Sequence, residues 1–388
     1  MELSLSEEQE LIRDSARKFV AGTPLANEPT VGGGDGSARA ALWRELASHG
    51  FLAIGLPPEY GGLGGAAELA IVCREFGKHP LRAPYVSSAV FPGQLLAAGG
   101  SAEQKSALLP KIIRGELTAA VAYCEPDGQL DAAQPTASAT RHGLDYVLNG
   151  RKCLVLNGGE AELLMVSARI DDGDLADNCA LFLLERAQAG VSLVELPLLD
   201  GTRCADVNLK DVRVTRSSLV GMEGNGSASL RHALRYATLA ACSEIAGAVS
   251  QALQVTVSHV RNRKQFGVAL ADFQAVRAKL ADMAMDCEMA WAAVCTQIAS
   301  FDDPGQHDPQ MTAAMAKVVV DDIGQRVCGQ AIQLHGAMGI TEECGVGRYY
   351  KLAVLTRALY GSSPSRLLEY SRGLAQMLHN CVAAGRQP

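Results

Sequence analysis

The sequence lacks a long apolar run and lacks a basic, apolar leader. Its first eight residues are mostly polar and acidic, whereas a signal peptide needs basic residues followed by an apolar stretch. No window is long and apolar enough to cross a bilayer. We therefore expect a cytoplasmic protein without a membrane span.

Two further kinds of site lack the residues that they need. No stripe of Lys and Arg is long enough to follow nucleic-acid phosphates, and the formal net charge is -7 at pH 7. The 11 cysteines are scattered without the paired spacing of metal ligands. We expect no nucleic-acid partner and no metal site, and buried thiols in place of disulfides.

The hydrophobic pattern divides the 388 residues into three parts. An acidic helix start after Ser6, with Leu11, Ala16 and Val20 at helical spacing, opens a helical N-terminal part. Short apolar runs at residues 146–148, 163–166 and 180–184 predict strands in the middle. Long apolar helices over residues 240–260 and 273–298 predict a C-terminal bundle whose helices need packing partners.

Glycine-rich breaks at residues 32–36 and 56–65 predict loops within the first part. The division assigns residues 1–118 to an N-terminal helical domain, 119–225 to a central β domain and 226–388 to a C-terminal helical bundle. No internal repeat and no low-complexity tract interrupts this order. The fold class that we expect is α+β, mostly α.

Seven short strings, in this order and spacing, resemble the acyl-CoA dehydrogenase family over nearly the whole chain. They lie at residues 50–54, 58–62, 125–126, 149–152, 157–159, 263–267 and 333–339. The resemblance implies an N-terminal helical domain, a central β-barrel and a C-terminal four-helix bundle, assembled as a dimer of dimers. It also implies FAD shared across a subunit interface, an acyl-CoA thioester substrate and electron-transferring flavoprotein as the electron acceptor.

The resemblance assigns one group of residues to the nucleotide half of FAD. Arg263 presents a fork of donors suited to a pyrophosphate oxygen, with Phe266 beside it and Gly267 at a turn. Small residues after Gln333 let the cofactor approach the backbone; they are Gly336, Ala337 and Gly339. The alternative interpretation is that Arg263 is a helix-end cation and that the glycines form a turn between helices.

The positions that face the flavin ring in this family depart from its pattern. Cys124 stands where the family has a threonine, Leu130 where it has a serine, Leu154 where it has a tryptophan and Leu156 where it has a second threonine. Ser362 completes the predicted cofactor positions. Such a slot can hold an apolar ring but donates little to a reduced, negatively charged flavin.

The catalytic base of the family is missing from both positions where the family places it. These positions correspond to Tyr360 and Ala237, and neither residue is a carboxylate. A phenol titrates near pH 10, so Tyr360 is a poor substitute. Glu244 lies two helical turns beyond Ala237 and cannot replace it, while Glu125 belongs to a loop where other family members carry the same residue.

The leading hypothesis is therefore the base-less subunit of a heteromeric α2β2 acyl-CoA dehydrogenase, in which a second, similar chain supplies the base. Some such assemblies act on bulky thioesters such as steroid side chains. One alternative is a homomeric flavoenzyme with a different reaction that uses Cys124 or Tyr360. The other alternative is a non-catalytic scaffold that has lost FAD.

Overall fold

The computed structural model describes residues 5–23, 36–81, 83–126, 134–171, 177–303 and 308–383. Contacts divide the chain into two compact units. The first unit combines Met1–Val31, Ala66–Leu81 and Thr238–Pro388, and the second combines Gly32–Gly65 and Arg82–Ala237. The division into three domains at residues 118 and 225 stays a prediction.

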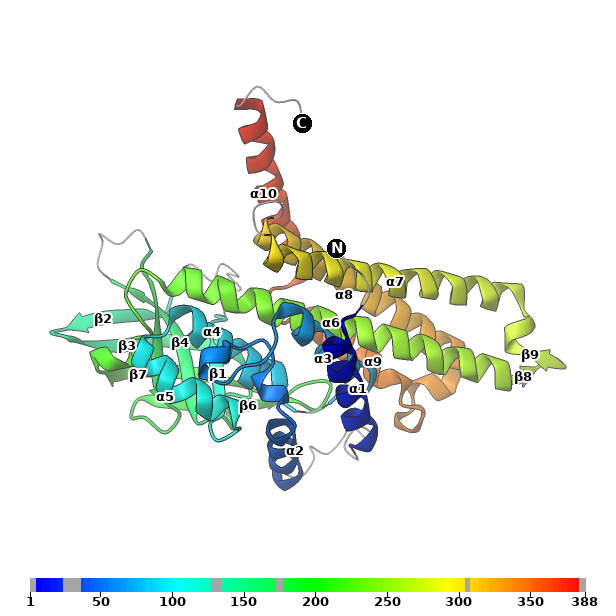
Figure 1. The fold of residues 1–388 in the computed structure, drawn as a ribbon, viewed down its shortest axis with the longest axis horizontal. Helices are drawn as coiled ribbons and strands as arrows, with labels where there is room; N and C mark the ends of the chain where they lie inside the picture. Colours follow the sequence, from blue (N-terminus) through cyan, green and yellow to red (C-terminus); the bar gives the residue numbers. More distant parts are fainter. Residues whose placement is uncertain are drawn as a thin grey trace. The chain divides into compact units, whose positions relative to one another are not determined.

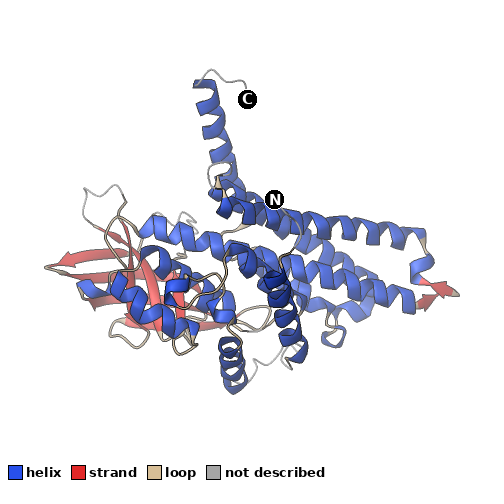
Figure 2. Cartoon of the chain, in the orientation of Figure 1, coloured by secondary structure: helices blue, strands red, loops and turns tan. Residues whose placement is uncertain are grey.

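The first unit is helical. Figure 1 shows α6, α7 and α8 running side by side, and Figure 2 shows a short hairpin of two strands that joins α6 to α7. The elements are α1 (Glu7–Gly22), α3 (Ala66–Lys78), α6 (Gly226–Asn262, from Thr238 onward), β8 (Lys264–Gln265), β9 (Val268–Ala269), α7 (Gln274–Asp302), α8 (Pro309–His335), α9 (Val346–Thr356) and α10 (Ser363–Ala383).

The predicted helix start at Ser6 is confirmed. The Ser6 hydroxyl accepts a hydrogen bond from the backbone N–H of Gln9, and the Gln9 side chain accepts one from the backbone of Ser6. Ala16 and Val20 are buried, whereas Leu11 lies on the exposed face of α1. Residues 32–35 of the loop predicted at 32–36 lie outside the described residues, and Gly36 begins α2.

Helices α3 and α6 cross with their backbones in contact. A Cβ atom placed on Gly77 would lie 1.8 Å from the carbonyl oxygen of Glu244, and one on Gly247 would lie 1.9 Å from the carbonyl oxygen of Arg74. Only glycine fits at these two positions. The guanidinium of Arg74 also lies over the ring of Trp291 on α7, 4.0 Å from its centroid.

The second unit combines short helices with one curled sheet (Figures 1 and 2). Its helices are α2 (Gly36–Ser48), α4 (Phe91–Gly99), α5 (Ala102–Ile113) and the first residues of α6, with a π-helical turn at Val86–Val90 before α4. Its strands are β1 (Ala119–Ala122), β2 (Ser138–His142), β3 (Asp145–Leu156), β4 (Leu163–Ile170), β5 (Cys179–Glu185), β6 (Val191–Pro197) and β7 (Arg203–Val214).

The sheet mixes parallel and antiparallel pairs. Its strand order is β1-β4-β2-β3-β7-β6, and β5 pairs with β4. Strands β1 and β2 run parallel to β4, while the pairs β2–β3, β3–β7, β4–β5 and β6–β7 are antiparallel. Register shifts in the β3–β7 pair lie between Leu148 and Gly150 and between Lys152 and Val155. These shifts bend β3 close to the predicted flavin-facing residues.

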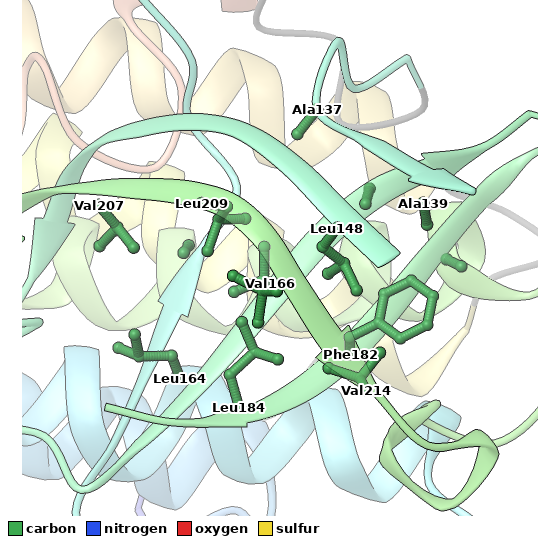
Figure 3. Close-up of a cluster of buried hydrophobic side chains, with 14 of the residues drawn as sticks. Ala137, Ala139, Leu148, Leu164, Val166, Phe182, Leu184, Val207, Leu209 and Val214 are labelled. Carbon is green, nitrogen blue, oxygen red and sulfur yellow. The ribbon is translucent and has the colours of Figure 1, made fainter. Parts of the chain in front are cut away.

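The strands curl around one apolar core. Figure 3 shows side chains such as Leu164, Val166, Leu184 and Val207 directed toward one another from different strands. Phe182 packs edge-on against Tyr146, with their ring centroids 5.1 Å apart. The three apolar runs predicted as strands lie in β3, β4 and β5, so those predictions are confirmed.

The predicted α+β, mostly helical fold class is confirmed. The predicted helix at residues 240–260 lies within α6, and the one at residues 273–298 lies within α7 apart from Phe273, the residue before this helix. Among the described helices, none is long and apolar enough to cross a membrane.

Candidate functional site

The predicted phosphate-binding residues begin at the end of α6. The backbone N–H of Arg263 still donates to the carbonyl oxygen of His259, and its carbonyl oxygen accepts from Leu270 beyond the hairpin. Phe266 and Gly267 form the turn between β8 and β9 with φ angles of 54° and 86°. The Phe266 side chain is 93% exposed and meets Phe273 edge-on.

The second predicted phosphate-binding segment ends α8. His335 is the last residue of this helix, and Gly336 follows with a φ of 64°. The buried ring of His335 stacks on His259, with centroids 4.2 Å apart. His259 is one helical turn before Arg263, so this stack brings two segments that are distant in sequence to the same end of the helices.

These residues fit one end of a dinucleotide. Arg263 and Gln333 are exposed, and a Cβ atom added to Gly336 would meet no atom within 4 Å, so the backbone there is open. Gly339 is closed, because a Cβ atom on it would lie 2.6 Å from the carbonyl oxygen of Ile332. An exposed guanidinium and an open backbone segment at the same end of the helices suit a pyrophosphate, and the exposed ring of Phe266 suits a flat partner.

The predicted base position lies at the other end of this unit. Tyr360 is buried and adopts a left-handed φ of 56°, which is uncommon for an aromatic residue. The buried Arg366 on α10 donates to the carbonyl oxygen of Tyr360 at 2.5 Å and to Thr238 Oγ1 at 3.3 Å. A Cβ atom on Gly361 would lie 2.4 Å from Arg366 Nε, so the glycine lets the guanidinium close over the turn.

The segment before Tyr360 is held by a second buried cation. Lys317 on α8 donates to Asp321 Oδ2 at 2.5 Å and to the carbonyl oxygen of Thr356 at 2.7 Å. The side chains of Lys317 and Asp321 are fully buried. The turn that presents residue 360 is therefore fixed at both of its ends.

Two carboxylates of the first unit could be considered as bases, and that of Glu369 is engaged elsewhere. Glu369 Oε2 lies 2.7 Å from Arg366 Nη1, and Glu369 Oε1 accepts a hydrogen bond from the side chain of Gln310. Glu244 lies two helical turns beyond Ala237 on α6, and its backbone carbonyl oxygen faces Gly77 of α3. Neither carboxylate takes the place of a base at position 360.

The predicted flavin-facing residues lie in the second unit. The backbone N–H of Cys153 donates to the carbonyl oxygen of Cys124 at 2.9 Å, so the loop after β1 lies against β3. Leu154 is partly exposed and has a left-handed φ of 54°, and Leu156 is half-buried. Burial raises the pKa of the Cys124 thiol to about 11, so this thiol is protonated at neutral pH and cannot act as a base. Leu130 lies outside the described residues.

A buried ion pair supports the loop that carries Cys124. Lys152 Nζ lies 2.6 Å from Glu125 Oε1 and donates to Ser167 Oγ at 3.0 Å. Glu125 also accepts hydrogen bonds from the backbone and hydroxyl of Thr136 and from the backbone of Ala137. The sequence string containing Glu125 thus has a structural role, which sequence reasoning did not assign.

Sequence comparisons cover all three parts of the chain. The family described as acyl-CoA dehydrogenase, N-terminal domain, matches residues 6–116, the middle domain matches residues 120–212 and the C-terminal domain matches residues 224–374. The chain belongs to the acyl-CoA dehydrogenase family. The enzyme class and the cofactor expected from the sequence, an oxidoreductase that uses FAD, are those of this family.

Several known acyl-CoA dehydrogenase relatives extend over nearly the whole chain. Acryloyl-CoA reductase (NADH) of Anaerotignum propionicum is 30% identical over 94% of this chain and 93% of its own. The caffeyl-CoA reductase–Etf complex subunit CarC of Acetobacterium woodii is 28% identical over 89% and 92%. A solved structure of a variant of the Tcur3481-Tcur3483 steroid ACAD superposes with a TM-score of 0.85 at 27% identity, covering 97% of this chain and 100% of that chain.

The Glu125–Lys152 pair predicts an acid-sensitive contribution to the stability of this acyl-CoA dehydrogenase family member. Burial alone would raise the pKa of Glu125, but hydrogen bonds from Lys152, Thr136 and Ala137 lower it from 4.5 to about 2. Because the folded-state value is lowered, the stabilisation is present above pH 4.5 and is lost as the pH falls toward 2. The full loss amounts to about 3 kcal/mol.

The measurement is the urea midpoint between pH 6 and pH 3, compared with that of the double variant Lys152→Leu, Glu125→Leu. The double variant lacks both charges, so its midpoint should fall less steeply with acid. Equal slopes for the two proteins would show that other groups cause the acid sensitivity.

The structure brings the predicted site residues together in three groups. Arg263 and Phe266 lie at one end of the first unit, together with the segment that follows Gln333. Tyr360 and Ser362 lie at the other end of this unit. The predicted flavin-facing residues lie in the second unit. Ala237 is fully buried on α6 and is the last residue of the second unit. The binding roles of these residues stay predictions. Sequence reasoning missed Arg366 and Lys317, because a cation in an amphipathic helix ordinarily indicates an exposed face.

Proposed function

We propose that this chain is the base-less subunit of a heteromeric acyl-CoA dehydrogenase that introduces a double bond between C2 and C3 of a CoA thioester. In this role it supplies the nucleotide-binding half of an FAD site to a partner chain. The partner chain supplies the carboxylate that removes the C2 proton.

The main support is the separation of two groups within the first unit. Arg366 joins Tyr360 to Thr238 near one end of the helices, whereas Arg263 follows the other end of α6. Asn262 lies 24 residues beyond Thr238, which corresponds to about 36 Å of helix. A dinucleotide whose phosphates contact Arg263 cannot also place its ring beside Tyr360 of the same chain, so Arg263 serves a neighbouring subunit.

The residues of this chain then have limited chemical roles. Arg263 neutralises a pyrophosphate oxygen, and the open backbone at Gly336 offers amide donors. Bound FAD supplies the hydride acceptor. Leu154 and Leu156 would present apolar side chains to the flavin ring, and buried Tyr360 fills the predicted position of the base without taking a proton. The chain therefore binds and orients, and the proton transfer belongs to the partner.

The relatives support parts of this proposal. The name of the steroid ACAD structure joins Tcur3481 with Tcur3483, which favours a two-chain assembly for this chain and leaves a steroid-type acyl group as one substrate class. The name of CarC places that protein in a complex with Etf, which favours electron-transferring flavoprotein as the redox partner here. Acryloyl-CoA reductase is named for the reverse reaction.

The decisive experiment is purification of the chain alone and together with the product of an adjacent gene that encodes a similar chain. We expect low FAD occupancy and no acyl-CoA oxidation for the chain alone, and full occupancy and turnover for the pair. Turnover by the lone chain would reject the subunit role. A yellow homo-oligomer that is not reduced by any acyl-CoA would favour a different flavin reaction, and a colourless, stable homo-oligomer would favour a scaffold.

Arg263→Lys offers a sharper test in the assembled pair. A lysine keeps the charge but loses the two-pronged geometry, so we expect the FAD dissociation constant to rise about tenfold, while the acyl-CoA dissociation constant stays the same. Arg261→Lys, at an exposed position near the end of α6, is the matched control. Equal FAD affinity for the two variants would contradict the assignment of Arg263.

A further inference from the structure

The segment after β1 and the strand β3 place two cysteines opposite each other. The backbone N–H of Cys153 donates to the carbonyl oxygen of Cys124 at 2.9 Å. Glu125, which follows Cys124, meets Lys152, which precedes Cys153, through their 2.6 Å ion pair. One residue number rises as the other falls, so the two segments run antiparallel at this point. Cys124 and Cys153 are therefore directly opposite residues.

The two thiols lie on the same face of these segments. Successive side chains of an extended segment point to opposite faces. Glu125 and Lys152 meet on the inner face, because both side chains are almost completely buried. Their neighbours Cys124 and Cys153 therefore share the other face, where both are half-buried and are free thiols.

The charge of one thiol affects the other. Burial raises the pKa of the Cys124 thiol to about 11, and a thiolate at Cys153 contributes to this rise. Burial also raises the pKa of Cys153, and the charge of Asp206 adds to that effect. Both thiols are therefore protonated at neutral pH, and they react slowly unless the pH is raised.

The spacing of this pair permits a disulfide but does not favour it. Directly opposite residues joined by a backbone hydrogen bond have Cα atoms about 5.5 Å apart, and a disulfide spans about 4.4–6.8 Å. Their Cβ atoms are about 4.5–5.5 Å apart, whereas a disulfide holds them at about 3.5–4.5 Å. The two segments must therefore move closer to form the bond. A disulfide made in this way is strained and is readily reduced.

The irregular part of β3 allows this movement. The register of the β3–β7 pair shifts between Lys152 and Val155, and Leu154 has a left-handed φ of 54°. Residues in such a bulge are not held by the regular hydrogen bonds of the sheet. Cys153 lies within the bulge, so its backbone can shift toward Cys124 without breaking the paired parts of the strand.

We infer that Cys124 and Cys153 are a redox-active pair that cycles between two thiols and one disulfide. This modification site does not depend on acyl-CoA chemistry. It lies at a predicted flavin-facing position, and the disulfide leaves no thiol hydrogen at residue 124 for a hydrogen bond.

Hydrogen peroxide is the oxidant in the forward step. One thiolate attacks a peroxide oxygen, the O–O bond breaks, and the sulfur becomes a sulfenic acid as the first water leaves. The second thiol attacks that sulfur, the S–S bond forms, and the second water leaves. Two thiols and one peroxide thus give one disulfide and two waters. In the reverse step two glutathione molecules supply the two electrons and become glutathione disulfide.

The test is peptide mapping of the full-length protein before and after treatment with hydrogen peroxide at about pH 8.5, where more thiolate is present. Trypsin releases Cys124 in the peptide of residues 115–141 and Cys153 in the peptide of residues 153–169, and each peptide has a single cysteine. After oxidation we expect both free peptides to be lost and a linked peptide to appear, lighter than their sum by two hydrogen atoms. Glutathione should restore the two free peptides.

Two variants identify the partners. Cys124→Ser should abolish the linked peptide. Cys204→Ala is the matched control, because Cys204 on β7 lies opposite Leu156 and not opposite Cys153, and this variant should keep the link. Absence of the link in the oxidised parent protein, or a link from Cys153 to Cys204, overturns the pair. A link that resists glutathione overturns the cycle, because it would be an ordinary structural disulfide.

Discussion

Replacing Tyr360 with glutamate should create acyl-CoA dehydrogenase activity in this chain. Tyr360, in a left-handed turn with Gly361, is buried at the position that the sequence predicts for the family's base. A carboxylate there is ionised at neutral pH, and Arg366 beside the turn favours its charged form. General-base catalysis contributes about 10²- to 10⁴-fold, so we expect a gain of that size over the parent chain.

The measurement is a single-turnover assay of the chain with FAD added in excess to overcome its low affinity, in which acyl-CoA is mixed rapidly with the protein and loss of the flavin absorbance is followed. The matched control is Tyr360→Gln, which has nearly the shape of glutamate but cannot take the proton. If the glutamine variant gains as much as the glutamate variant, the added rate comes from space in the pocket. In that case the missing base is not what limits this chain.

Replacing Lys317 with methionine should cause the largest loss of stability among single changes near the site. The change removes the charge that compensates the fully buried Asp321 and a donor to the carbonyl oxygen of Thr356. Breaking a buried pair by removing one partner costs about 3–5 kcal/mol. We expect a clearly lower urea midpoint, and we expect the turn at Tyr360 to become sensitive to proteolysis at the same time.

Two comparisons define the cause of that loss. Lys351→Met removes one partner of a partly exposed pair with Glu342 and should cost less than about 1 kcal/mol. The double variant Lys317→Met, Asp321→Leu removes both buried charges and should recover most of the stability. A single Lys317 variant as stable as the Lys351 variant would argue against a structural role for the buried pair.

The fold was more predictable from the sequence than the site. Apolar periodicity predicted α6, α7 and the strands in β3, β4 and β5, because burial of one face repeats along the chain. The cations at positions 317 and 366 carry no such signal, since their burial depends on carbonyl oxygens that only the folded chain brings near them. The same holds for His259 and His335, whose stacked rings come from two different helices. The string around Arg263 predicted a turn, and its exposed aromatic tip emerged only from the structure.

The glycine crossing of α3 and α6 limits how the chain can be divided. Gly77 and Gly247 place two backbones in direct contact, so α3 is a neighbour of α6 even though the whole β sheet separates them in sequence. A recombinant fragment that begins at residue 226 would lack α3. The backbone of α6 at Gly247 would then be exposed to water, because glycine has no side chain to cover it. Fragments made for crystallography or biosensing should therefore retain α3 together with α6.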